Sequence, residues 1–213
     1  MFWRCEMTTV YFFEIPSDFN IKNYSFIDSF SSEQLNSKKN TPQNKYLSSL
    51  LAKIIVKKVA LKTLNANICD ISIDYGDFGK PYLKNHPNFH FNISHCKNAV
   101  AVAFSNSPVG IDIEKISTKK EKVAKRYFSF KENEYINKSA NSDTAFYEIW
   151  TKKEAYFKRN GTGINADFSK ISVLSEQIAK QIHTFKNNSF IISLCGEDIE
   201  NFELNIINKD FFK

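Results

Sequence analysis

The stretch VGIDIEKI, which begins at residue 109, constrains the fold of this chain more than any other feature. Its residues alternate with the period of a β-strand whose two faces meet different surroundings. The apolar face consists of Val109, Ile111 and Ile113. Asp112 and Glu114 project together from the other face. In a central strand their unpaired charge would be costly, and a hard divalent cation bound through oxygens would relieve that cost. An edge strand with its polar face in water is the alternative.

Strand and helix signals alternate along the rest of the chain. The first half predicts a strand at 8–15, a helix at 45–64, a strand at 68–75 and a strand hairpin at 90–95 and 99–105. The second half predicts the strand at 109–116, helices at 119–128 and 146–164, and strands around 171–175, 190–195 and 202–207. The similar order of the two halves predicts an α+β fold of two α/β lobes, residues 1–108 and 109–213, with the site in the cleft between them.

Composition narrows the class of protein. The chain has 213 residues, and its 29 Lys and Arg exceed its 23 Asp and Glu, which gives a net charge of +6. That excess favours anionic partners such as phosphates, nucleic acid or an acidic protein. The four cysteines form no CxxC pair, so neither a zinc site nor a disulfide framework is indicated. No apolar run could span a bilayer and the first residues do not resemble a signal peptide, so we expect a cytoplasmic protein without a membrane partner.

A second group of charged residues lies on the helix predicted at 146–164. Trp150, Glu154 and Lys158 are spaced four apart and therefore share one face, with Lys153 at its margin. Solvated, the Glu154–Lys158 pair would contribute only ~0.3–0.5 kcal/mol. The glycines that follow, at 161 and 163, can be read as a helix C-cap.

Two shorter motifs supply further polar candidates. In FHFNISH, Ser94 and His95 lie at the end of a predicted strand, where side chains can turn into a cleft; a structural histidine is the alternative. No GxSxG elbow accompanies them, so they do not indicate a hydrolase. In GKP, Lys80 is held between Gly79 and a proline, which could direct it at a phosphate, although the spacing is not that of a phosphate loop. A solvated turn lysine is the plain reading.

A basic segment follows the carboxylate strand. Between Lys115 and Arg126 the chain has six basic residues and one acidic residue. Such a run is usually a solvated helix face, but it also suits an acidic partner.

The order and spacing of these motifs carry more information than any one of them. GKP, FNISH, GIDIE, FSxxE and WxxKEAxxKxxGxG follow one another between Gly79 and Gly163, about 85 residues. This series resembles the 4′-phosphopantetheinyl transferases, specifically the larger pseudo-dimeric type that activates peptide synthetases. The resemblance implies transfer of the 4′-phosphopantetheine arm of coenzyme A to a serine of an apo acyl or peptidyl carrier protein. Adenosine 3′,5′-bisphosphate is the other product.

The resemblance also implies roles for individual residues. Asp112, Glu114 and Glu154 would be the Mg²⁺ carboxylates. Lys80, Ser94 and His95 would hold the nucleotide end of coenzyme A. Lys158 and Lys153 would meet the pyrophosphate. The catalytic set would be Asp112, Glu154 and Lys158, with Glu154 or a water on the metal accepting the proton of the carrier serine.

The match is weaker at other positions. The family has basic coenzyme A contacts ahead of the first long helix, and here only Lys45 falls at a matching place, with Lys38 and Lys39 as possible substitutes. Glu132 matches the glutamate of FSxxE, and Trp150 would be structural or a wall of the site. The first lobe would then contact the nucleotide, and the second would hold the metal and receive the carrier.

Two other functions fit parts of the sequence. One is a different Mg²⁺-dependent transferase that acts on a nucleotide, which would not bind coenzyme A. The other is a basic nucleic-acid-binding module, but the chain has no RNP-like or similar signature, so we expect no nucleic-acid partner. Since both lobes belong to one chain, we expect a monomer.

Overall fold

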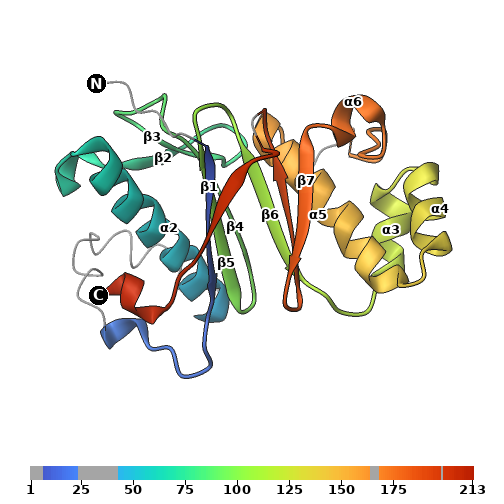
Figure 1. The fold of residues 1–213 in the computed structure, drawn as a ribbon, viewed down its shortest axis with the longest axis horizontal. Coiled ribbons are helices and arrows are strands. Elements are labelled where there is room, and N and C mark those ends of the chain that lie inside the picture. Colours follow the sequence, from blue (N-terminus) through green and yellow to red (C-terminus); the bar gives the residue numbers. More distant parts are fainter. Residues whose placement is uncertain (1–6, 24–42, 164–167, 198) are drawn as a thin grey trace.

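The computed structural model describes residues 7–23, 43–163, 168–197 and 199–213. It confirms an α+β fold with two lobes, each a sheet covered by one long helix (Figure 1). Lys38, Lys39 and the side chain of Lys45 lie outside the described residues. Within the part of the chain that is described, no helix has the length and apolar character needed to cross a membrane.

The first lobe is built on a four-stranded sheet in the order β4-β5-β1-β9. Its strands are β1 (Thr8–Glu14), β4 (His90–Cys96), β5 (Ala99–Ser105) and β9 (Phe202–Ile206). The hairpin predicted at 90–105 is confirmed as β4 and β5, which pair antiparallel. Helix α2 (Gln43–Leu64) covers the outer face with its apolar side chains. The short strands β2 (Ile73–Tyr75) and β3 (Pro81–Leu83) form a separate ribbon beside it.

The second lobe has a three-stranded sheet in the order β6-β8-β7. Its strands are β6 (Gly110–Lys115), β7 (Ile182–Asn187) and β8 (Phe190–Cys195). Helix α5 (Ser142–Asn160) covers the outer face and contacts both β6 and β8. The shorter helices are α3 (Glu121–Tyr127), α4 (Phe130–Lys138) and α6 (Glu176–Ala179). The described residues also form the 3₁₀ turns η1 (Ile21–Asn23), η3 (Ile68–Asp70) and η4 (Lys209–Phe212).

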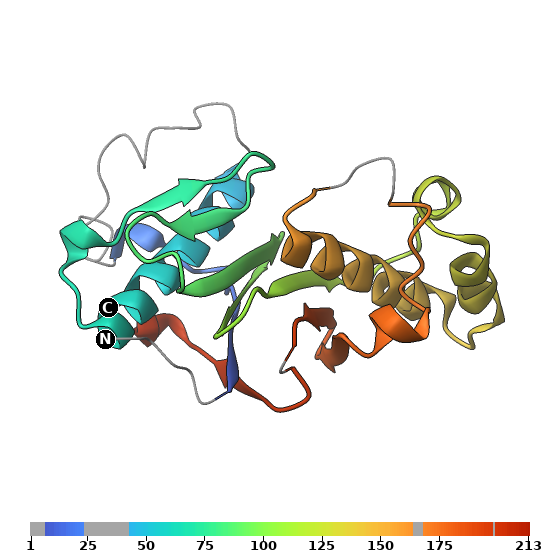
Figure 2. The same ribbon diagram turned by 90° about the horizontal axis from the view of Figure 1, so that it is seen from above.

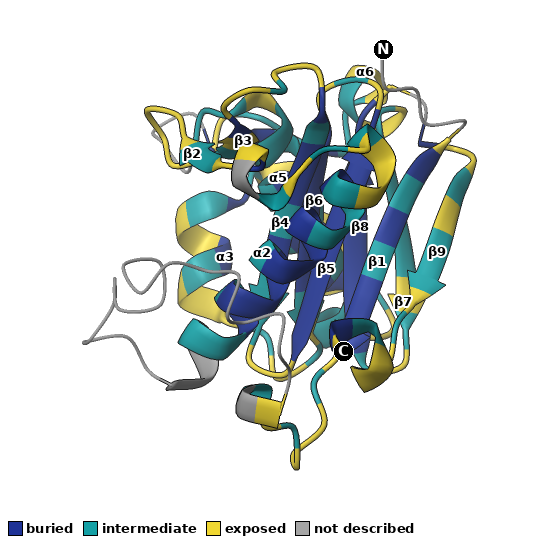
Figure 3. Cartoon of the chain, turned by 90° about the vertical axis from the view of Figure 1, so that its left-hand side faces the viewer, coloured by how far each residue is buried: buried dark blue, intermediate teal, exposed yellow. Residues whose placement is uncertain are grey.

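The two sheets pack face to face, so the molecule has four layers in the order α2, first sheet, second sheet, α5 (Figure 2). The inner layer consists of apolar side chains from β1, β5, β6 and β8, among them Phe12, Ala101, Ile111 and Ile192. Strand alternation explains this arrangement, because the neighbours of these residues face α2 or α5 instead. The central strands are accordingly buried along most of their length (Figure 3).

Alternation on β6 agrees with the sequence pattern. Val109, Ile111 and Ile113 join the core between the sheets. The side chains of Asp112 and Glu114 therefore face the α5 side of the sheet. Strand β6 lies at an edge of its sheet, yet Asp112 is buried, so the alternative of a solvated polar face is wrong for this residue.

Three predictions about the elements are wrong. Residues 171–175 form turns rather than a strand, and the strand predicted at 68–75 is reduced to 73–75. Strand β7 was not predicted; it turns into β8 through Asn188, whose φ of 52° is that of a tight left-handed turn. The division at 108 and 109 stays a prediction; residues from the end of the chain return to the first lobe, where β9 pairs parallel with β1 and Phe212 packs in the core under α2.

Candidate active site

The candidate site lies where the edge of the first sheet meets β6. Strand β4 lies at the edge of the first sheet. Two of its polar side chains, rather than its backbone, hydrogen-bond to the backbone of β6. Asn92 Oδ1 accepts a hydrogen bond of 2.9 Å from the backbone N–H of Ile111, and Ser94 Oγ accepts one of 3.3 Å from the N–H of Ile113. These bonds fix β6 against the first lobe at the residues that flank Asp112.

Asp112 is at the centre of the polar cluster. Its side chain is 6% exposed, and Ser94 Oγ donates a hydrogen bond of 2.8 Å to Oδ1. Lys158 Nζ lies 2.5 Å from the same oxygen and 2.9 Å from Ser94 Oγ. The other oxygen, Oδ2, is buried and has no hydrogen-bond partner among the residues that the structure describes. Since an unpaired buried carboxylate oxygen is costly, this atom indicates a place for a ligand that binds oxygen.

Glu114 and Glu154 are electrostatically coupled to Asp112. Burial and, second, the Asp112 charge together raise the pKa of Glu114 to about 7, against the opposing effects of Lys120, Lys158 and a hydrogen bond from Trp150. Burial likewise raises the pKa of Glu154 to about 7, with Asp112 and Glu114 adding to the rise and Lys158 opposing it. Three carboxylates that repel one another in a buried place are a favourable environment for a cation.

The donor set fits Mg²⁺ by its chemistry. It offers carboxylate oxygens, which hard cations prefer, and one of them has no partner in the described part of the chain. Among the described residues, no group of three or more His, Cys, Asp or Glu is already gathered closely enough to hold a metal. The Lys158 ammonium is the cation in contact with Asp112, so the arrangement has to adjust if a metal ion enters.

A second cation, Lys80, lies at the junction of the two lobes. Its Nζ donates to the carbonyl of Arg159 at 2.8 Å and, more weakly, to that of Val109 at 3.4 Å. Burial lowers the pKa of Lys80 to about 8, and the Arg159 charge adds to the effect. A cavity of about 230 Å³ between the GKP turn, β4 and the end of α5 is lined by Lys80, Glu154 and Lys158. A phosphate in it would meet both lysines and lie beside the carboxylates.

Similarity to known proteins agrees with this geometry. The profile described as "4′-phosphopantetheinyl transferase, N-terminal" matches residues 22–107, and that of the "4′-phosphopantetheinyl transferase superfamily" matches residues 108–207. The 4′-phosphopantetheinyl transferase gsp of Aneurinibacillus migulanus is 34% identical over 168 residues, which cover 74% of this chain and 68% of that protein. The chain belongs to the 4′-phosphopantetheinyl transferase superfamily.

Two further relatives match a smaller share. The 4′-phosphopantetheinyl transferase Sfp of Bacillus subtilis strain 168 is 34% identical over 131 residues, 61% of this chain and 58% of Sfp. An L-aminoadipate-semialdehyde dehydrogenase-phosphopantetheinyl transferase of Candida glabrata is 32% identical over 136 residues, 58% of this chain and 53% of that protein. The matched part therefore spans less than two thirds of these two proteins.

In this member of the superfamily, most of the predicted site residues are brought to the lobe junction. Asp112, Glu114, Glu154, Lys158 and Ser94 form the cluster described above. Lys80 lies at the cavity with Lys158. Trp150, predicted to be structural or a wall of the site, packs edge-on to Tyr127, with ring centroids 6.1 Å apart, and hydrogen-bonds to Glu114; its role stays a prediction.

One predicted coenzyme A contact, His95, is not part of this cluster. His95 is half-buried on the face of β4 that alternation turns toward α2, whereas Ser94 faces β6. Its role stays a prediction, as does that of Lys45, whose side chain is outside the described residues.

Lys153 is not a pyrophosphate contact. Its side chain is 0% exposed and forms an ion pair with Glu132, whose side chain is also fully buried. Burial lowers the pKa of Lys153, and Glu132 opposes the effect. One residue along a helix is a rotation of about 100°, which separates Lys153 from the face of Glu154.

Two functional positions were missed. Asn92 was quoted in FNISH without a role, yet it joins β4 to β6. Gly110 shares the face of Asp112 and Glu114 by alternation, and a Cβ there would lie 1.9 Å from the Ala155 carbonyl oxygen. The glycine that opens GIDIE was the available signal, since glycine in a strand often marks a close backbone approach.

Proposed function

We propose that the protein transfers the 4′-phosphopantetheine arm of coenzyme A to a serine of an apo acyl or peptidyl carrier protein, with Mg²⁺ as cofactor. The observation that carries the proposal is the cluster of the buried Asp112 with the half-buried Glu114, Glu154 and Lys158 beside a lysine-lined cavity, in a chain of this superfamily. The serine oxygen forms a bond to the β-phosphorus of coenzyme A. The bond from that phosphorus to the bridging oxygen breaks, and adenosine 3′,5′-bisphosphate leaves with that oxygen.

The residues of the chain divide this work. Asp112, Glu114 and Glu154 would hold Mg²⁺, which supplies charge neutralisation at the pyrophosphate when bound. Lys158 and Lys80 orient the phosphates by charge, which is most of what phosphoryl transfer requires. Glu154 lines the cavity together with Lys158, and we assign the proton of the serine hydroxyl to Glu154 or to a water on the metal.

The direct test is to incubate the protein with coenzyme A, Mg²⁺ and a panel of apo carrier proteins, and then to weigh each carrier by mass spectrometry. We expect one carrier or more to gain the mass of phosphopantetheine, and none to do so with excess EDTA. A panel without any mass gain would contradict the proposal. If calorimetry also showed no coenzyme A binding, a transferase acting on another nucleotide would become the better reading.

The proposal also includes the oligomeric state of the enzyme, its compartment and its partners. All the side chains of the cluster come from one chain, which supports a monomeric enzyme. Cys96 and Cys195 are free thiols, in keeping with a reducing cytoplasm. Neither a nucleic acid nor a membrane is needed as a partner.

Lys80 provides a prediction about coenzyme A binding. Its ammonium makes charge-assisted hydrogen bonds, so Lys80→Met should weaken binding about 10–100-fold near pH 7. Because the pKa of Lys80 is about 8, raising the pH from about 7 to about 9 discharges it and should weaken binding by the wild type but not by the variant. Isothermal titration calorimetry measures both, with Lys84→Met, an exposed lysine after β3, as the control. If the coenzyme A affinities of wild type and Lys80→Met change equally with pH, the Lys80 ammonium does not contribute to coenzyme A binding.

The basic helix α3 provides a prediction about the carrier. Lys122 and Lys125 are exposed on it, a short distance along the chain from the carboxylate strand. If the carrier is acidic, the double variant Lys122→Glu/Lys125→Glu should raise the apparent KM for the carrier about 10-fold at low salt and much less at high salt. Steady-state rates at two ionic strengths check this. An unchanged KM at low salt would place the docking surface elsewhere.

A further inference from the structure

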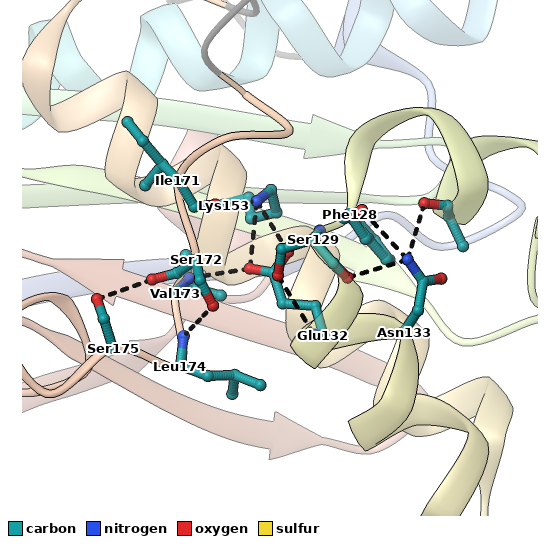
Figure 4. Close-up of polar contacts among 11 residues, drawn as sticks. Phe128, Ser129, Glu132, Asn133, Lys153, Ile171, Ser172, Val173, Leu174 and Ser175 are labelled. Carbon is teal, nitrogen blue, oxygen red and sulfur yellow. Dashed lines mark hydrogen bonds and ion pairs between the residues drawn. The ribbon is translucent and has the colours of Figure 1, made fainter.

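A fully buried ion pair, Glu132–Lys153, connects α4 to α5 (Figure 4). Lys153 Nζ is 3.2 Å from Oε1 and 3.0 Å from Oε2 of Glu132, and neither side chain is exposed. Lys153 also donates to the carbonyl oxygen of Ile171, and its ammonium lies 5.3 Å from the centre of the Phe168 ring. The pair thus joins α4, α5 and the segment that follows α5 in the chain.

Glu132 binds the backbone at two further points. Its Oε2 accepts a hydrogen bond of 2.7 Å from Ser129 N–H, which completes the capping box of α4. Its Oε1 accepts one of 2.9 Å from Val173 N–H. Figure 4 shows these contacts converging on one carboxylate from both sides. With two backbone donors and an ammonium bound, the carboxylate of Glu132 is well satisfied.

Stability alone does not explain why the pair is charged. Burying two ions has a large desolvation cost, and a well-packed apolar pair is often as stable or more so. Ion pairs in such places have their best-attested use in fixing one arrangement among several. The question is therefore which arrangement this pair fixes.

Its position on α5 provides the answer. The helix is held on two other sides, by the close approach of Gly110 to the Ala155 carbonyl and by a bond of 2.8 Å between Thr151 Oγ1 and Ser193 Oγ of β8. The Glu132–Lys153 pair adds a contact with α4. Together the three contacts set the rotation of α5 about its axis. That rotation decides whether Glu154, the next residue after Lys153, faces Asp112.

We propose that the Glu132–Lys153 pair is a positioning device that holds Glu154 and Lys158 in register with Asp112 for cation binding and transfer. Neither residue touches substrate. The proposal rests on the proposed function for the identity of the reaction. It predicts that the pair controls the affinity of the carboxylate cluster for a divalent cation.

The test separates positioning from stability with a double variant. Glu132→Gln or Lys153→Met alone leaves one buried partner without its counterpart and should lower the melting temperature. Glu132→Gln/Lys153→Met removes both charges and should recover most of it. We expect the double variant to bind Mn²⁺, followed by electron paramagnetic resonance, about 10–100-fold more weakly than the wild type. Its kcat should fall by a similar factor, with little change in KM for the carrier.

The control is Glu134→Gln/Lys138→Met, which removes the same two charges from an exposed ion pair of α4. It should leave melting temperature, Mn²⁺ affinity and kcat unchanged. If the buried double variant, with its melting temperature recovered, keeps wild-type Mn²⁺ affinity and kcat, the pair is only structural and the proposal is overturned. If that variant does not fold, Glu132→Asp keeps the charge but shortens its reach, and unchanged Mn²⁺ affinity there overturns the proposal too.

Failure of the proposed function gives a different result. A wild type that binds Mn²⁺ but modifies no carrier contradicts the reaction alone, and the comparison of Mn²⁺ affinities still decides the role of the pair. A wild type that binds no Mn²⁺ overturns the positioning role together with the metal site.

Discussion

Replacing Asp112 by Asn or Glu154 by Gln should abolish phosphopantetheine transfer without unfolding the protein. Each change removes a carboxylate that we assign to Mg²⁺, and loss of one such electrostatic contact lowers kcat about 10²–10³-fold. Asp112→Asn keeps an oxygen that can accept from Ser94 and Lys158, and Lys158 is 28% exposed, so water can solvate its ammonium. Transfer measured by carrier mass and melting temperature measured by calorimetry check the two halves of the prediction.

Glu154→Gln should also make the protein more stable in the absence of a divalent cation. The folded-state pKa of Glu154 is about 7, above the ordinary value of 4.5, so the folded state binds more protons than the unfolded state between these values. The free energy of unfolding of the wild type therefore falls as the pH rises through 7. The variant lacks this contribution and should have the higher melting temperature at about pH 8 but not at about pH 5, in EDTA.

Exposed Glu134→Gln serves as the control for both variants, since it changes the same chemical group away from the site. Near-normal transfer by Asp112→Asn or Glu154→Gln would refute the metal assignment. A melting temperature of Glu154→Gln that follows the wild type at every pH would show that the carboxylates do not repel one another in solution.

Gly110→Ala should have the largest effect on folding. A Cβ at this position would lie 1.9 Å from the carbonyl oxygen of Ala155 and 2.6 Å from the amide nitrogen of Arg159, both backbone atoms of α5. Relief requires that α5 or β6 moves as a unit. We expect a loss of about 3 kcal/mol or more in the free energy of unfolding and a fall of roughly 6–12 °C in melting temperature.

Gly76→Ala is the matched control, because the nearest atom to its added Cβ would be the Lys80 carbonyl oxygen, 3.8 Å away. It should leave the melting temperature nearly unchanged. If Gly110→Ala melts with the wild type and transfers normally, then α5 is free to shift, and the rotational register proposed for it is wrong.

The sequence predicted the parts of the site that local patterns encode. Alternation in VGIDIEKI predicted which side chains of β6 enter the core, and the four-residue spacing in α5 predicted that Trp150, Glu154 and Lys158 share a face. The strand patterns at 90–95 and 99–105 likewise predicted the β4–β5 hairpin. These features depend on the period of a single element, which the sequence displays directly.

The parts of the fold and of the site that the sequence did not predict depend on contacts between elements. In the sequence, Lys153 and Glu154 are neighbouring charged residues of a polar helix, and nothing in the pattern says which one is buried. Only the packing of α4 against α5 decides that Lys153 is buried with Glu132. Strand β7 begins Ile-His-Thr-Phe and lacks strict alternation, so pairing with β8 rather than its own pattern defines it. Residues 171–175 have strand-like composition but hold Glu132 through the Val173 N–H, outside any sheet.

The parallel pairing of β9 with β1 has a consequence for biosynthesis. Residues 202–206 complete the first sheet, and Phe212 contacts Phe13 in its core with ring centroids 4.8 Å apart. A ribosome delivers these residues only after the whole second lobe has been made. The first lobe therefore cannot complete its sheet during synthesis before the second lobe has been made, unlike the usual order in which an amino-terminal unit folds first. Until β9 is made, the β1 edge of the first sheet has no partner strand. An unpaired strand edge can bind another chain, so this edge is where a chaperone would bind.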